Sequence, residues 1–400
     1  MPRKVKNWLG AYVKKVADLS ESPESYHWWS AATIVCASLK RHVWVPRGTW
    51  KLYPNMYTVL IGPPGIGKGS ALNPAIDLLK TTKSANIMSG RLTIEYVLER
   101  LGKGFAGPIN NNGHMTIGTE ASLIIFSPEF DVFVTASQHT FGILTDIWDC
   151  KDGDWEYGTR HHGQYYIHNP CISLLAGCTS DKLVELLPSI TIGAGFTRRV
   201  NFVYAKDNAN LIPWPAEVVF NDPDLVHDLR CVSLLRGQFS WEVKGRLKPT
   251  DRLLKEFDDY YQRTRRATGF MDEATASYNS SRYVHAIKLC MAISAARSDD
   301  LIITIDDWRE ATTRIDQCSE DLKSVFRGVG ESDTAFATNR VIEFLKINGR
   351  SSRQQILSVN WNHMSSQTLD VVMSTLIGGG IVIEINCGPK VLYQLIQQVP

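Results

Sequence analysis

A glycine-rich segment with one lysine has the residue types and the spacing that bind phosphate groups. It reads Gly62-Pro63-Pro64-Gly65-Ile66-Gly67-Lys68-Gly69-Ser70 and lies between an apolar, β-prone run (Met56–Ile61) and a helical pattern over 71–80. Glycines allow successive N–H groups to face one anion, the helix N-terminus adds partial positive charge, and Lys68 can reach the β- and γ-phosphates. A strand, a loop and a helix in this order predict that all nine residues bind a nucleotide.

The segment departs from the usual phosphate-loop pattern at one position. That pattern has a hydroxyl residue directly after the lysine, whereas this chain has Gly69 there and Ser70 one position later. We expect ATP and Mg²⁺ as cofactors, with Ser70 as the metal ligand. The loop resembles that of adenylate kinases, which also read G-K-G-[ST]. The alternative interpretation is a Gly-Pro turn that connects a strand to a helix and binds nothing.

Two further polar residues follow apolar runs that are typical of buried strands. Glu129 comes just after the run Ser122–Phe126, and Thr179 directly follows the run Cys171–Cys178. A carboxylate at a strand end can activate water for hydrolysis, so we expect Glu129 to be the base and Thr179 to orient the water. The aspartate that commonly precedes such a glutamate is replaced by Pro128. The alternatives are a strand-end acid and a hydroxyl that satisfies a strand end.

Several cations are candidates for contacting the transferred phosphate. Arg198 and Arg199 precede an apolar run at Val200–Tyr204, and an arginine there could stabilise transition-state charge in a neighbouring subunit. That role requires a ring with sites between subunits; the alternative is an intrachain salt bridge. Arg282 and Lys288 lie on a strongly apolar helical segment. They could return to the phosphates from a lid, or they could be surface charges.

Nucleic-acid contacts are predicted at two places. The segment 154–169 has the pattern of a hairpin with Arg160, His161 and His162 at its tip and four aromatic residues beside them. A few cations beside aromatic rings suffice to contact phosphates and bases, although a solvated hairpin with packed aromatics is equally compatible. Lys390 lies between two short β-prone runs near the end of the chain and is the second candidate.

Composition indicates a globular protein with ample apolar material for a core. Of 400 residues, 44% are hydrophobic and 21% charged, and the net charge is +2, so no overall field requires a nucleic-acid partner. The eight cysteines contain no C-x-x-C pair, which favours reduced core thiols in a cytoplasm-like compartment. No secretory signal is evident, and no apolar run approaches the ~18 residues that span a membrane. We therefore expect no membrane partner.

Apolar runs that alternate with helical patterns predict a mostly parallel sheet flanked by helices. We expect an α/β fold in four segments: a helical N-terminal collar (1–50), a P-loop NTPase core (51–210), a linker with a helical lid (211–330) and a C-terminal domain (331–400). The last segment reads as three helices followed by a β-hairpin, which is the winged-helix pattern.

The order of several motifs resembles a known family. SPESYHWW, RHVWV, LYPNMYTVLIGPPGIGKGS, LIIFSPEF, SLLAGCTSDKLVELLP and GAGFTRRVNFVY follow one another as in phage and prophage replicative-helicase-like P-loop ATPases, a family of the domain-of-unknown-function type. The resemblance covers about 22–321. A weaker likeness to mini-chromosome-maintenance helicases rests on Glu129-Phe130-Asp131 and on 197–201. It implies an AAA+ ring motor in which Arg199, with Arg198 second, acts across the subunit interface.

These observations predict an ATP-dependent DNA helicase or translocase of a phage or mobile-element replication system. We expect a hexamer-like ring on single-stranded or forked DNA, in the cytoplasm (that of the host for a phage protein), with a primase or polymerase as a possible partner. One alternative is a helicase loader or adaptor that binds ATP, DNA and proteins without unwinding. Another is a small-molecule nucleotide kinase, which the sequence G-K-G-S suggests.

Overall fold

The chain forms two compact units, Met1–Arg327 and Gly328–Pro400, which are described separately. The structure, a computed structural model, describes residues 2–17, 19–111, 114–133, 138–159, 163–186, 195–208, 211–212, 222–242, 252–266, 273–325, 333–361, 364–387 and 390–396. None of the helices within these ranges has both the length and the apolar character needed to cross a membrane.

A five-stranded, wholly parallel sheet is the centre of the first unit. Its strand order is β11 (Val200–Tyr204), β3 (Tyr57–Ile61), β10 (Cys171–Cys178), β7 (Ser122–Ser127) and β4 (Ile87–Ser89). The predicted α/β architecture with a parallel sheet is confirmed, and four strands coincide with predicted apolar runs. β4 was not predicted, because three residues are too short to give a periodic signal.

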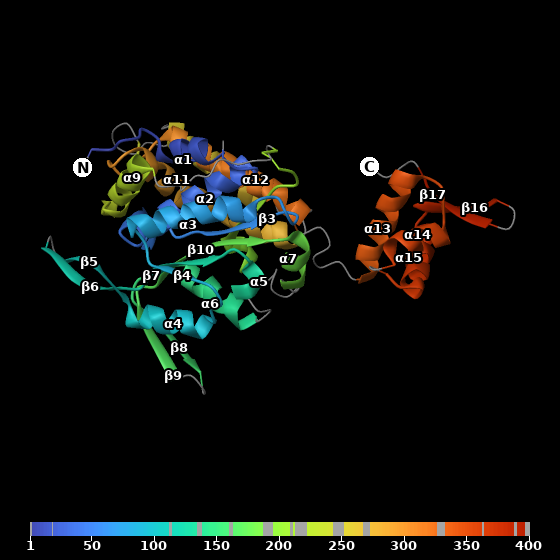
Figure 1. The fold of residues 1–400 in the computed structure, drawn as a ribbon, viewed down its shortest axis with the longest axis horizontal. Helices are drawn as coiled ribbons and strands as arrows, with labels where there is room; N and C mark the ends of the chain where they lie inside the picture. Colours follow the sequence, from blue (N-terminus) through green and yellow to red (C-terminus); the bar gives the residue numbers. More distant parts are fainter. Residues whose placement is uncertain are drawn as a thin grey trace. The chain divides into compact units, whose positions relative to one another are not determined.

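Helices cover both faces of this sheet (Figure 1). On one face, α2 (Glu24–Leu39) packs on β3, β10 and β11 and also on α3 (Lys68–Thr82), while α6 (Gln138–Trp148) packs on β10 from the other. Almost every residue of α2 is buried, as expected for a helix that is apolar all round. Further helices, α11 (Glu273–Arg297) and α12 (Ile305–Val325), pack on α2 and β11 respectively. The predicted collar, core and lid segments therefore share one compact unit.

The N-terminal helix α1 (Trp8–Ala17) packs on α2 and on α9 (Pro223–Ser233). Its apolar stripe is buried against its own unit. Elsewhere in the unit, α4 (Ile94–Lys103) packs on a hairpin that follows α6. The remaining elements are β1 (Val43–Arg47), β2 (Trp50–Leu52), β5 (Phe105–Asn111), β6 (His114–Glu120), α5 (Phe130–Phe133), β8 (Asp154–Thr159), β9 (Gly163–His168), α7 (Ser180–Leu186), η1 (Thr197–Arg199), β12 (Gly237–Gln238), β13 (Ser240–Trp241), α10 (Arg252–Arg266) and β14 (Ile302–Ile303).

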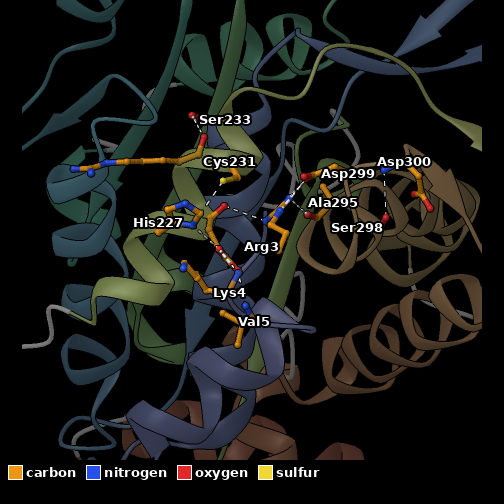
Figure 2. Close-up of polar contacts among 12 residues, drawn as sticks. Arg3, Lys4, Val5, His227, Cys231, Ser233, Ala295, Ser298, Asp299 and Asp300 are labelled. Carbon is orange, nitrogen blue, oxygen red and sulfur yellow. Dashed lines mark hydrogen bonds and ion pairs between the residues drawn. The ribbon is translucent and has the colours of Figure 1, made fainter. Parts of the chain in front are cut away.

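The start of the chain is fixed to the first unit by one buried carboxylate. Asp228 on α9 is fully buried and accepts hydrogen bonds from the backbone N–H groups of Lys4 (2.9 Å) and Val5 (2.8 Å). Arg3 donates to the Asp228 carbonyl oxygen at 3.0 Å and to the carboxylate of Asp299, just beyond α11, at 2.6 Å. Figure 2 shows Arg3, Lys4 and Val5 at this junction of α9 and α11.

The second unit contains three helices and a small antiparallel sheet. The helices are α13 (Asp333–Asn348), α14 (Arg353–Asn360) and α15 (Ser366–Gly378), and the sheet order is β15 (Ser351–Ser352), β17 (Lys390–Leu395) and β16 (Val382–Cys387). The helices and the hairpin follow the predicted order, and β15 is an additional strand. The side chain of Ser352 caps α14 in a reciprocal capping box with Gln355, which explains why the helix begins at this point.

Candidate functional site

The glycine-rich loop connects the fully buried strand β3 to the first turn of α3, and three glycines determine its path. Gly65 and Gly67 both have φ of +84°, a conformation that L side chains rarely adopt. At Gly62 an added Cβ would lie 2.5 Å from the Tyr26 hydroxyl oxygen and 2.7 Å from the Ala205 carbonyl oxygen. The loop therefore requires glycine for two reasons, backbone conformation and close approach of neighbouring groups.

The loop presents a group of N–H donors and one ammonium. Within the described part of the chain, the backbone N–H groups of Gly67, Lys68, Gly69 and Ser70 form no hydrogen bond. The Lys68 ammonium lies on the same loop, where it donates to the carbonyl oxygens of Gly62 (2.7 Å) and Pro63 (3.0 Å). Partial burial lowers its pKa. Free N–H groups at a helix N-terminus beside an ammonium form a site suited to a polyphosphate.

The sheet order brings the ends of two other strands to this loop. β10 lies between β3 and β7 and is in register with both, so that Cys178 pairs with Ile61 and Ala176 pairs with Ser127. Carboxyl ends of parallel strands meet at one sheet edge, where α/β proteins bind ligands. A Cβ on Gly177 would lie 2.6 Å from the Pro128 carbonyl oxygen and 3.6 Å from the Lys68 Cβ.

Two carboxylates and an unpredicted lysine follow β7 and β10. Glu129 is exposed, and its side chain forms no hydrogen bond or ion pair among the described residues. Two residues later, Asp131 accepts a hydrogen bond from the Lys182 ammonium of α7 at 2.5 Å. This contact and the field of Glu129 raise the pKa of Lys182. Lys182 was not predicted as a site residue, because its only signal in the sequence is its place three residues after Thr179.

Thr179 lies between β10 and α7, half-buried, and its hydroxyl accepts a 3.4 Å hydrogen bond from the Lys182 N–H. The adjacent Cys178 thiol is buried, which raises its pKa to about 12. Asp131 raises this pKa further, whereas Lys182 and Lys68 lower it. Because Lys68, Asp131 and Lys182 all shift the pKa of the Cys178 thiol, the three charged groups lie close to the end of β10, beside Cys178 and Thr179.

Tyr26 and Asp321, which were not predicted as site residues, lie near the end of β3, where the loop begins. The Tyr26 hydroxyl of α2 donates to the carbonyl oxygen of Ile61, the last residue of β3. Asp321 of α12 is near Tyr26 and Tyr204, and partial burial raises its pKa to about 6. Neither residue has a sequence signal, because their approach to the loop depends on how α2 and α12 pack against the sheet.

The two candidate finger arginines lie at the amino-terminal ends of the strands, where β11 begins. The glycine-rich loop lies at the carboxyl-terminal ends. Arg199 is 6% exposed, and its guanidinium donates to both carboxylate oxygens of Asp149 at 3.0 Å. This intrachain salt bridge is the alternative that the sequence left open. The Arg198 side chain is half-buried and has no hydrogen-bond partner among the described residues, although its carbonyl oxygen binds the His285 ring at 2.8 Å.

Neither of the two lid candidates reaches the loop in this chain. Arg282 forms an ion pair with Asp316 of α12 and a hydrogen bond to Asn279. Lys288 is only 1% exposed and donates to the carbonyl oxygen and the side-chain oxygen of Asn55, which precedes β3. The five residues of β3 separate Asn55 from the loop by about 17 Å. Lys288 is therefore neither a surface charge nor a phosphate ligand of its own loop, because its ammonium is held at Asn55, before the start of β3, whereas the loop follows the end of that strand.

The predicted hairpin exists, as β8 and β9 pair in antiparallel register from 154 to 168. Its tip residues Arg160, His161 and His162 lie outside the described residues. On its strands, Trp155 stacks on Tyr157 at 5.8 Å, whereas Tyr166 is 57% exposed. The other three aromatic residues of the hairpin are half-buried, and the nucleic-acid contact stays a prediction. Lys390 begins β17, and its side chain is likewise outside the described set.

Two places in the described part of the chain offer side-chain atoms that could bind a metal ion. Ser70 is exposed in the first turn of α3, where its hydroxyl has no partner among the described residues and can serve as a ligand. His227, Asp228 and Cys231 also cluster on α9. The Asp228 oxygens already accept N–H groups from Lys4 and Val5, and the His227 Nδ1 contacts the same carboxylate at 2.8 Å. This second cluster is satisfied by protein donors and fits a structural role.

Comparison with protein-family models gave no match to the chain, and comparison with curated protein sequences gave none either.

Proposed function

We propose that the protein is an ATP-dependent DNA helicase or translocase that works as a ring of identical subunits. One observation supports the ATPase assignment most strongly. A glycine-rich loop with Lys68, and with four N–H groups that have no partner among the described residues, lies at the same end of the strands as Glu129 and Thr179, because β10 is inserted between β3 and β7. A P-loop ATPase of the AAA+ type needs these parts in this arrangement.

In this proposal each group has one task. Lys68 and the loop N–H groups bind the β- and γ-phosphates, Glu129 accepts the proton of the attacking water, and Thr179 orients that water. Lys182 offsets the charge of the nearby carboxylates. Mg²⁺ bound to the triphosphate supplies further charge neutralisation, with Ser70 as its side-chain ligand.

The position of Arg198 supports action between subunits. It precedes β11, whereas the loop follows β3, so the two lie at opposite ends of the strands. An arginine there is too far from the loop of its own chain, so a nucleotide that it contacts must be bound by another copy. Arg199 is occupied by Asp149, so we assign the finger role to Arg198, with Arg199 holding the segment in place. This reverses the order of preference that the sequence resemblance implied.

The second unit supports the assignment to DNA in a more limited way. We propose that its three helices and its β15-β17-β16 sheet form a winged helix, a module that contacts DNA through a helix and the hairpin. The tip of the β8–β9 hairpin, with Arg160, His161 and His162, remains the predicted contact of the first unit.

The test is DNA-stimulated ATP hydrolysis by two lysine variants of the same helix. Lys68→Ala removes the ammonium from the loop and should abolish turnover. Lys80→Ala changes an exposed residue of α3 that pairs with Asp77 and should leave turnover unchanged. Undiminished hydrolysis by the Lys68 variant would sink the assignment.

A helicase loader is the second candidate, and two observations favour it. Pro128 replaces a carboxylate at the end of β7, and Arg199 is locked in an intrachain ion pair. Both would suit a protein that binds ATP without rapid cycling. A forked-duplex assay separates the candidates: strand separation that depends on ATP and Lys68 supports the helicase, whereas ATP-dependent DNA binding with no separation supports the loader.

A further inference from the structure

A cavity lies near the amino-terminal ends of the strands, on the side of the sheet opposite the glycine-rich loop. It has a volume of about 550 Å³, within the usual range of ligand pockets. Its walls come from β2, the segment that follows α6, the turn before β11, the end of α10, and α11. These elements belong to one compact unit, so the cavity is complete within a single chain.

The cavity has more positive than negative groups. Six lysine or arginine residues and two aspartates line it. Both aspartates already have cationic partners, because Asp149 pairs with Arg199, and Asp152 pairs with Arg41 and Lys51. The cavity therefore has no carboxylate left for its other cations.

Three lining cations have no carboxylate partner among the described residues. Arg198 lies near Arg199 and Arg265, and burial together with these like charges lowers its pKa. Arg265 stands over the ring of Tyr283 at 5.8 Å. Lys288 is buried on the Trp148 ring at 3.9 Å, and burial lowers its pKa to about 8. Like charges held together in a half-buried cavity repel one another, and a bound anion removes that repulsion.

We propose that this cavity binds a small phosphate anion of the pyrophosphate class between the guanidinium groups of Arg198 and Arg265, with the positive charge of Lys288, which is buried on Asn55, behind them. Two guanidinium groups offer the forked donors that match phosphate oxygens, and the lysine adds a point charge. The site is separate from the loop at the carboxyl-terminal ends of the strands. A phosphate group could reach Arg198 either as a free anion or on the nucleotide of a neighbouring copy, and the experiment separates these sources.

The test is isothermal titration of the full chain carrying Lys68→Ala with pyrophosphate. That background removes the loop ammonium and so weakens the loop as a competing site, and the titration contains no nucleotide that a neighbouring copy could present to Arg198. We expect one pyrophosphate per chain. Arg198→Gln and Arg265→Gln should each weaken binding at least tenfold, since each removes a charge-assisted hydrogen bond. Arg266→Gln, a change at the next residue of α10, which does not line the cavity, should have no effect.

Three results would overturn the inference. Loss of all pyrophosphate binding in the Lys68→Ala background would assign it to the loop. Equal weakening by Arg266→Gln would indicate non-specific attraction. Binding of a short oligothymidylate that depends on Arg198, with no binding of pyrophosphate, would identify a DNA contact instead. Arg265 is exposed and has no ion-pair partner among the described residues, so its variant should fold, and none of these readouts requires ATP turnover.

Discussion

Gly177→Ala tests whether the contact between β10 and the Pro128–Glu129 turn positions the proposed catalytic carboxylate. The new Cβ would lie 2.6 Å from the Pro128 carbonyl oxygen, whereas ordinary contacts begin at 3.4 Å, so about 0.8 Å must open. β10 is hydrogen-bonded on both sides and cannot move alone. The turn that carries Glu129 should therefore shift away from Lys68.

Two magnitudes follow from this displacement. Overpacking of this kind costs about 1–3 kcal/mol of unfolding free energy. A catalytic group misplaced by about 1 Å lowers turnover roughly 100-fold. At moderate temperature the variant should remain folded, but its base should be misplaced. Turnover should therefore fall far more than the loss of stability alone would cause.

The assay compares urea unfolding with steady-state phosphate release. Gly142→Ala is the matched control, because Gly142 lies within α6 with open space around its Cβ position. That change should stabilise the helix by about 0.5–1 kcal/mol and leave turnover unchanged. Wild-type stability and turnover in Gly177→Ala would refute the reasoning, and so would an equal loss of turnover in Gly142→Ala.

Three other predictions concern buried charge. Asp149→Ala leaves the Arg199 guanidinium buried without a carboxylate, and because Asp149 is one-third exposed we expect the free energy of unfolding to fall by about 2–3 kcal/mol. The control Asp146→Ala, at an exposed ion pair, should lower it by under about 1 kcal/mol. Equal losses for the two variants in thermal melts would contradict this prediction. Burial raises the pKa of Asp321 from 3.8 to about 6, so ionisation of this residue destabilises the fold as pH rises through this window. Asp321→Asn should match wild type near pH 4 and be about 1 kcal/mol more stable at pH 7. A stability difference that does not change with pH would disprove that ionisation of Asp321 is the cause. Burial lowers the pKa of His285 from 6.5 to about 3, so it contributes stability above pH 6.5 that is lost as pH falls toward 3; His285→Gln should show a shallower acid slope in melting temperature, and an unchanged slope would exclude this histidine as a source.

Short-range sequence signals identified the parts of the fold that depend on them. Apolar runs bounded by turn residues located β3, β7, β10 and β11, and the glycine spacing located the loop whose conformation the structure describes. The strand order was not predictable in detail. The insertion of β10 between β3 and β7, which brings Glu129 and Thr179 beside Lys68, depends on packing across distant segments rather than on local pattern.

Cationic residues were the least predictable part of the candidate site. Arg199, Arg282 and Lys288 have the same local signal whether they face a phosphate, a carboxylate or a buried amide. The structure gives each a protein partner, Asp149, Asp316 and Asn55 respectively. Lys182 went unnoticed because its carboxylate partner, Asp131, follows a different strand. Ion-pair partners that are brought together only by tertiary packing give no periodic pattern in the sequence.

The attachment of residues 3–5 to Asp228 has a consequence for any shortened form of the protein. Trimming those residues would withdraw two main-chain donors from a carboxylate that is wholly shielded from solvent. Among the described residues, the carboxylate would keep only its contact with His227, and removing partners from a buried charge typically costs several kcal/mol. Residues 3–5, although they belong to no regular element, thus connect α9 to the end of α11. Deleting them should destabilise the packing of these two helices.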